Sequence, residues 1–149
     1  MTMIYCSKDM HTEFLESNGI DCLLFFLSRT DSFQIYLSFK CFTLLSRWEK
    51  NIEIITTEDI CIRISKNSLI RERRILKEGL RFFINILIYK RNDRDIVNRL
   101  CWLMNEGLLN SVDGECLKLS LFALMLVSEQ TNYHHKLITH KSLLSNLAA

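Results

Sequence analysis

Not one proline interrupts the 149 residues of this chain, and only four glycines punctuate it. Average usage would supply about 5% proline, so its absence favours helices joined by short turns over a many-stranded sheet. The chain is 48% apolar and 24% charged, which excludes disorder and provides for one hydrophobic core. We therefore expect residues 1–149 to form a single all-α domain.

Apolar side chains recur at helical spacing along the segment 33–48. They are Phe33, Tyr36, Leu37, Cys41, Leu44, Leu45 and Trp48. Phe39 and Phe42 lie on the opposite side, so this helix must pack on two sides. The apolar segment Gly19–Leu27 precedes it, and Asp31 is placed to cap the helix that follows. Together the two segments predict a helical hairpin.

The hairpin pattern returns further along the chain. A shift of 60 residues places Gly79–Leu87 on Gly19–Leu27 and Asp93–Asn105 on Asp31–Leu45. Gly79 then predicts a break in the helical stretch that ends at Tyr89. The pattern thus indicates repeated helical units.

Two further pairs of segments share a pattern of side-chain sizes. Glu115–Ser128 can be laid on Phe33–Ser46, and Lys136–Leu147 is similar to Glu13–Leu24. This succession of a short helix, a second helix entered at a glycine and a long third helix resembles the armadillo-like (ARM/HEAT-type) helical repeats, in degenerate form. The end of the chain is also loosely similar to rotatin-type scaffolds.

The armadillo resemblance assigns a role to each helix of a unit. His11–Ser17 matches a first helix, Gly19–Leu27 a second and Asp31–Arg47 a third. The resemblance implies an α-α superhelix, an armadillo-like solenoid segment with partial repeats at both ends, as expected of a fragment of a longer array. A non-repetitive helical bundle is the alternative.

The isoleucine-rich segment Asn51–Ser65 has an ambiguous pattern. Its isoleucines alternate in two short pieces, which favours a strand, whereas Thr57 and the two acidic residues after it resemble a helix start. A lone strand pair would have no sheet to join, so we predict a short helix from about Thr57. This segment also lengthens the first unit beyond the roughly 40 to 47 residues of one armadillo or HEAT repeat.

Several features predict a cytoplasmic protein. The N-terminal residues lack the apolar block of a secretory signal, and the longest apolar run, Leu121–Val127, is far shorter than the roughly 18 residues of a membrane-spanning helix. Cys22, Cys41, Cys61 and Cys101 lie within apolar patterns. They predict reduced core thiols rather than a disulfide framework.

The sequence carries no catalytic or metal-binding motif. It has no glycine-rich phosphate loop, no nucleophile elbow and no tuned carboxylate pair. His134, His135 and His140 lack zinc-ligand spacing, both among themselves and with Cys116. We therefore expect a protein that is not an enzyme and binds neither cofactor nor metal.

One charged segment stands out in a chain with a formal net charge of only +2. Between Arg71 and Arg99 nine basic residues accompany four acidic ones. Arg73, Lys77 and Arg81 are four residues apart and predict a positive ridge on one helix. The ridge is either a solvated face or one wall of a groove that recognises an acidic peptide. We expect no aromatic platform to interleave with these arginines, which gives the stacking of single-stranded RNA little support.

These patterns predict a non-catalytic scaffold for protein–protein interaction, of the kind common in cytoskeletal, centriolar and cell-polarity proteins. A partner peptide or helix would lie on an inner surface formed by Asp31–Arg47, Asp93–Asn105 and Glu115–Ser128. The expected partner-binding residues are Arg73, Lys77, Arg81, Arg94, Arg99 and Trp102. The alternatives are a nucleic-acid-associated helical module that uses the basic segment, and an oligomerising helical bundle.

Overall fold

The computed structural model describes residues 8–109 and 113–129, and all regular structure within these ranges is helical. The helices are α2 (Lys8–Glu16), α3 (Gly19–Leu27), α4 (Ser32–Leu45), α5 (Glu49–Ile55), α6 (Glu58–Ser65), α7 (Arg73–Tyr89), α8 (Arg94–Leu109) and α9 (Gly114–Ser128). The predicted all-α class is confirmed for these residues. None of these described helices has the length and apolar character needed to cross a bilayer.

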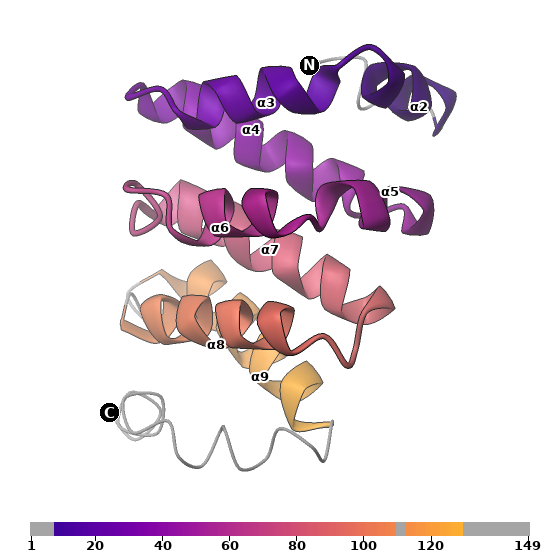
Figure 1. Ribbon diagram of the computed structural model, residues 1–149. Coiled ribbons are helices and arrows are strands. Elements are labelled where there is room, and N and C mark those ends of the chain that lie inside the picture. Colours follow the sequence, from indigo (N-terminus) through magenta and orange to yellow (C-terminus); the bar gives the residue numbers. More distant parts are fainter. Residues whose placement is uncertain (1–7, 110–112, 130–149) are drawn as a thin grey trace.

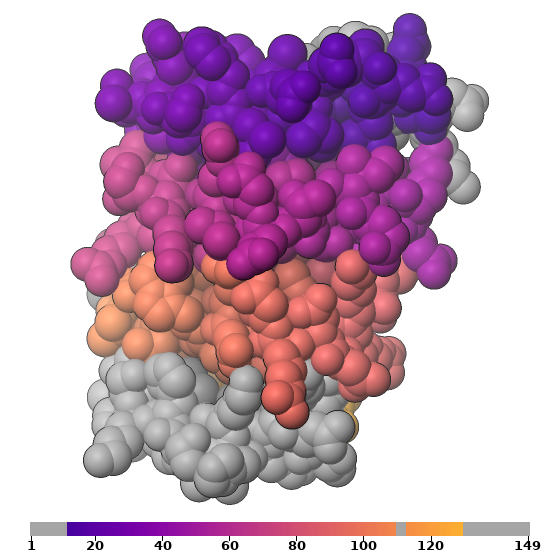
Figure 2. Space-filling model, in the orientation of Figure 1, coloured from indigo at the N-terminus to yellow at the C-terminus, as the bar shows by residue number. Residues whose placement is uncertain are grey.

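The helices are stacked in layers from α2 to α9 (Figure 1). Helices α4, α7 and α9 pack against one another in that order and form the long-helix row. Helices α3, α6 and α8 form a second row in front of it. The helices of the long-helix row begin at Ser32, Arg73 and Gly114, so each step is 41 residues. The described side chains of successive layers meet along the face shown in Figure 2.

This arrangement shows that the expected 60-residue shift is wrong. Gly79–Leu87 is not a separate second helix, because α7 runs without a break through Gly79. A Cβ atom at Gly79 would lie 3.2 Å from Ile70 Cδ1 and 3.4 Å from Phe39 Cε1. The glycine therefore allows close approach between neighbouring segments and does not end a helix.

The position of α8 is a second correction. The expected inner surface placed Asp93–Asn105 between the other two long segments, but α8 lies in the second row beside α6. Helix α7 takes the middle place in the long-helix row. The match between Glu115–Ser128 and Phe33–Ser46 agrees with the structure, because α4 and α9 lie in the same row, two steps apart.

The isoleucine-rich segment forms the two short helices α5 and α6. Thr57 caps α6, and its Oγ1 accepts a hydrogen bond from Ile60 N at 3.4 Å, which confirms the helix predicted from about Thr57. Ile52 and Ile55 on α5, like Ile60 on α6, are buried. Two short helices interrupted by a turn therefore produce the apparent alternation.

The centre of the core lies between α4 and α7. Phe39, Phe42, Phe82 and Phe83 are all fully buried. The Phe82 ring packs edge-on against Phe42 and Phe83, with ring centroids 6.0 and 5.1 Å away. This packing accounts for the two-sided apolar pattern of α4. Its predicted cap is also present, because Asp31 Oδ1 accepts a hydrogen bond from Gln34 N at 2.8 Å.

The described cysteines are free thiols. Cys41, Cys61 and Cys101 are buried as predicted, whereas Cys22 is exposed, because it lies on the side of α3 that faces away from the core. Burial raises the pKa of Cys41 to about 11 and that of Cys61 to about 12. These two thiols are therefore protonated and unreactive at neutral pH.

Candidate functional site

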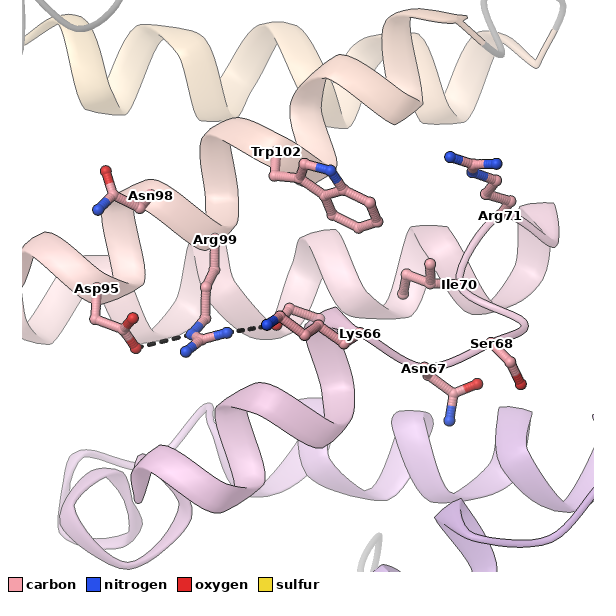
Figure 3. Close-up of a pocket in the computed structure, with 10 residues that line it drawn as sticks. Lys66, Asn67, Ser68, Ile70, Arg71, Asp95, Asn98, Arg99 and Trp102 are labelled. Carbon is pink, nitrogen blue, oxygen red and sulfur yellow. Dashed lines mark hydrogen bonds and ion pairs between the residues drawn. The ribbon is translucent and has the colours of Figure 1, made fainter.

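A groove of about 570 Å³ opens between α8 and the turn that follows α6 (Figure 3). Its residues are Ser65, Lys66, Asn67, Ser68, Ile70, Arg71, Asp95, Asn98, Arg99 and Trp102. Its volume lies within the range of roughly 300 to 1,000 Å³ typical of ligand pockets. Ile70 is the buried apolar residue of this lining, and most of the others are polar.

Asn67 shapes the turn on one side of the groove. Its Oδ1 accepts a hydrogen bond from Leu69 N at 3.0 Å, and its backbone oxygen accepts one from Ile70 N at 3.0 Å. Its Nδ2 donates to Leu27 O at 3.3 Å, which ties the turn to the end of α3. These bonds hold Lys66 and Arg71 at the groove.

Trp102 projects from α8 toward this turn and lies between Arg99 and Arg71 (Figure 3). Its side chain is 38% exposed, which leaves part of the indole open to a ligand. An aromatic side chain therefore does lie among these arginines, contrary to the expectation that no aromatic platform interleaves with them. The sequence separates Arg71 from Trp102 by a whole helix, and only the layered packing brings them to the same groove.

Both arginines are held by carboxylates on α8. Arg99 Nε donates to Asp95 Oδ2 at 2.8 Å, and its Nη1 donates to Ser65 Oγ at 2.8 Å. Arg71 Nε lies 3.2 Å from Glu106 Oε2. These charge-assisted contacts fix the two guanidinium groups as walls of the groove.

Lys66 is the third cation of the groove. It is exposed, and within the described ranges it has no ion-pair partner. The groove and the ion pairs of its walls include three cations, Lys66, Arg71 and Arg99, and two carboxylates, Asp95 and Glu106. The groove therefore carries a surplus of one positive charge beside a partly exposed indole.

The six predicted partner-binding residues do not form one site. The groove contains Arg99 and Trp102. Arg73, Lys77 and Arg81 do lie on one helix, α7, as predicted, and Arg73 is exposed. Arg94 is exposed in the first turn of α8 and does not line the groove.

The ridge on α7 is engaged by the start of α9. Lys77 Nζ donates to Glu115 Oε2 at 3.1 Å and lies 3.5 Å from Asp113 Oδ2. Arg81 pairs with Glu115 and, at 2.9 Å, with Glu78. The hydrogen bond with Lys77 lowers the pKa of Glu115 and raises the pKa of Lys77. Much of the ridge's charge is thus neutralised within the chain.

Sequence reasoning missed most of the groove. Asp95, Arg99 and Trp102 are spaced by four and three residues, so they share one side of α8, and this stripe is visible in the sequence. The contribution of the turn is not visible. Arg71 and Glu106 are 35 residues apart and meet only through packing of the layers.

No protein family, curated protein or solved structure matches this chain. Over residues 8–109 and 113–129 the structure contains no group of three or more His, Cys, Asp or Glu side chains that could hold a metal ion. His134, His135 and His140, and the segment Lys136–Leu147, lie outside the described residues.

Proposed function

We propose that this chain is an armadillo-like α-solenoid segment that acts as a non-catalytic scaffold for protein–protein interaction. The 41-residue step between the long helices supports the proposal, since it falls within the roughly 40 to 47 residues of such units. The division into two packed rows also supports it. A cytoplasmic, cytoskeleton-associated role belongs to the same proposal.

The groove around Trp102 is the observation that carries the binding function. A partly exposed tryptophan supplies apolar contact area and an N–H donor, the features that make this residue an anchor in interfaces. The surplus positive charge beside it orients an acidic partner. A peptide or the end of a helix would lie across the second row, at Arg99 and Trp102, rather than along the α7 ridge.

Two tryptophan variants test the proposal, one in the groove and one elsewhere as a matched control. Trp48 and Trp102 are both 38% exposed, but only Trp102 lines this groove. On an array of short peptides of varied sequence, Trp102→Ala should lose about tenfold or more in affinity, as anchor residues do. Trp48→Ala should bind as the unmodified chain does. Absence of peptide binding, or equal losses in both variants, would contradict the proposed function.

A nucleic-acid-associated module is the second candidate. Trp102 between Arg71 and Arg99 has the aromatic and cationic character of a surface that stacks single-stranded bases. Asp95 and Glu106 weigh against it, because they neutralise two of the three cations and would repel phosphates. Binding to an oligonucleotide that weakens steeply with salt would favour this candidate.

A further inference from the structure

We propose that the groove selects an extended peptide in which an Asp or Glu side chain pairs with Lys66 while a neighbouring large apolar side chain packs on Trp102. This inference rests on the proposed function and adds the residue preference of the partner. The preference follows from which cations of the groove already form ion pairs with described carboxylates of the chain and which one does not.

The two arginines are positioning residues rather than ligand contacts. The side chain of Glu106 is only 10% exposed, so a ligand that drew Arg71 away would break an ion pair made by a largely buried carboxylate. Arg99 is held by Asp95 and by Ser65. Because both guanidinium groups already face a carboxylate, an incoming acidic side chain gains less by pairing with either of them than by pairing with Lys66.

Lys66 differs from the arginines in its surroundings. It follows the last residue of α6, it is exposed, and none of the other described residues forms an ion pair with it. An ammonium group on a flexible stem can reach a carboxylate without a fixed geometry. Lys66 is therefore the cation that a partner's acidic side chain can pair with at no loss to the fold.

The surplus of one positive charge limits the acidity of the partner. A first carboxylate balances Lys66, but a second would meet Asp95, whose side chain is 53% exposed. A phosphodiester chain would meet the same repulsion. Trp102 and Ile70 supply the apolar contact for the neighbouring side chain. One acid beside one large apolar residue is thus the combination that fits the groove.

A charge swap at Lys66 tests this preference. The probes are arrayed Gly/Ser peptides that carry one Phe and, at varied short spacing, either one Glu or one Lys. The unmodified chain should prefer the Phe–Glu peptides by about threefold to fivefold, the range of an exposed ion pair. Lys66→Glu should prefer the Phe–Lys peptides. Lys118→Glu is the matched control, because this exposed lysine on α9 does not line the groove, and it should keep the original preference.

The outcomes separate the inference from the proposed function. If peptides bind but Lys66→Glu leaves the preference unchanged, or Lys118→Glu shifts it equally, the inference is overturned and the scaffold function stands. If the folded, unmodified chain binds no peptide of the array, the proposed function is overturned as well. Tighter binding of a single-stranded oligonucleotide than of any peptide would overturn both.

Discussion

The contact between α8 and α9 provides a test of the layered packing. A Cβ atom added at Gly107 on α8 would lie 2.1 Å from Ser120 Oγ on α9 and 3.4 Å from Leu80 Cδ1. Ser120 is buried, and its Oγ donates a hydrogen bond to Cys116 O at 2.8 Å. The methyl group of an alanine and the Ser120 hydroxyl therefore cannot both occupy their places.

Two opposing effects set the stability of Gly107→Ala. Alanine is favoured over glycine inside a helix by about 1 kcal/mol. Against this, Ser120 must turn and leave a buried hydroxyl unpaired, at about 1–3 kcal/mol, or the helices must separate, at a similar penalty. We expect a net loss of roughly 1 kcal/mol in the free energy of unfolding from these two terms.

Removing the Ser120 hydroxyl should turn the effect of Gly107→Ala from destabilising to stabilising. In a Ser120→Ala background the nearest atoms to the new Cβ are at 3.4 Å, which is ordinary contact, so Gly107→Ala should stabilise by about 0.5–1 kcal/mol. Urea unfolding of the four proteins measures this as a double-mutant cycle. Gly114→Ala, where the added Cβ meets no atom, is the control. An equal effect of Gly107→Ala in both backgrounds would refute the packing of Gly107 on Ser120.

Three other parts of the structure make measurable predictions. The hydrogen bond with Lys77 lowers the pKa of Glu115 in the folded chain. The ionised Glu115 therefore stabilises the fold fully above the ordinary pKa of 4.5, and this contribution is lost as the pH falls below 4.5. The urea midpoint of Glu115→Gln should therefore fall less between about pH 6 and pH 3 than that of the unmodified chain. If the midpoints of the two proteins fall in parallel, the pairing of Glu115 with Lys77 is contradicted. Phe82→Ala should lower the free energy of unfolding by about 3–5 kcal/mol, and a loss below about 1 kcal/mol would contradict its full burial. Iodoacetamide at mildly alkaline pH should label exposed Cys22 well before Cys61, whose pKa burial raises to about 12, and equal rates by mass spectrometry would argue against the packing of α6.

Local signals in the sequence were sufficient to predict most of the helices. Gly19–Leu27 is a helix with the bounds that its apolar run predicts, and Asp31 caps the next helix. Thr57 likewise begins α6. Caps and apolar periods depend on residues within a few positions of each other, so a single sequence contains the information needed to place them.

The order of the layers could not be predicted in the same way, because a glycine that allows close packing can lie at the start of a helix or in its middle, and the sequence does not tell the two positions apart. Gly19 follows Asn18, whose φ of 62° makes the sharp entry into α3. Gly79 lies in the middle of α7 and allows close contact with Phe39. Aligning one glycine on the other produced the wrong shift.

The candidate site also has a part that the sequence reveals and a part that only the packing of the layers creates. The stripe of Asp95, Arg99 and Trp102 on α8 can be read from helical spacing alone. The pairing of Lys77 with Glu115 spans 38 residues, so a sequence shows the basic ridge without the acid that neutralises it. Lys66 is inconspicuous in the sequence and becomes important only because the neighbouring arginines are already paired.

Amide hydrogen exchange, measured with and without a bound Phe–Glu peptide, tests the central claim most directly. The partner should slow exchange in the turn from Lys66 to Arg71 and in α8 around Trp102, and leave the exposed side of α4 unchanged. Arg74 on α7 lies over the Tyr36 ring of α4, 5.2 Å from its centroid. Slowed exchange confined to this part of the long-helix row, with the turn and α8 exchanging as in the free chain, would contradict the claim.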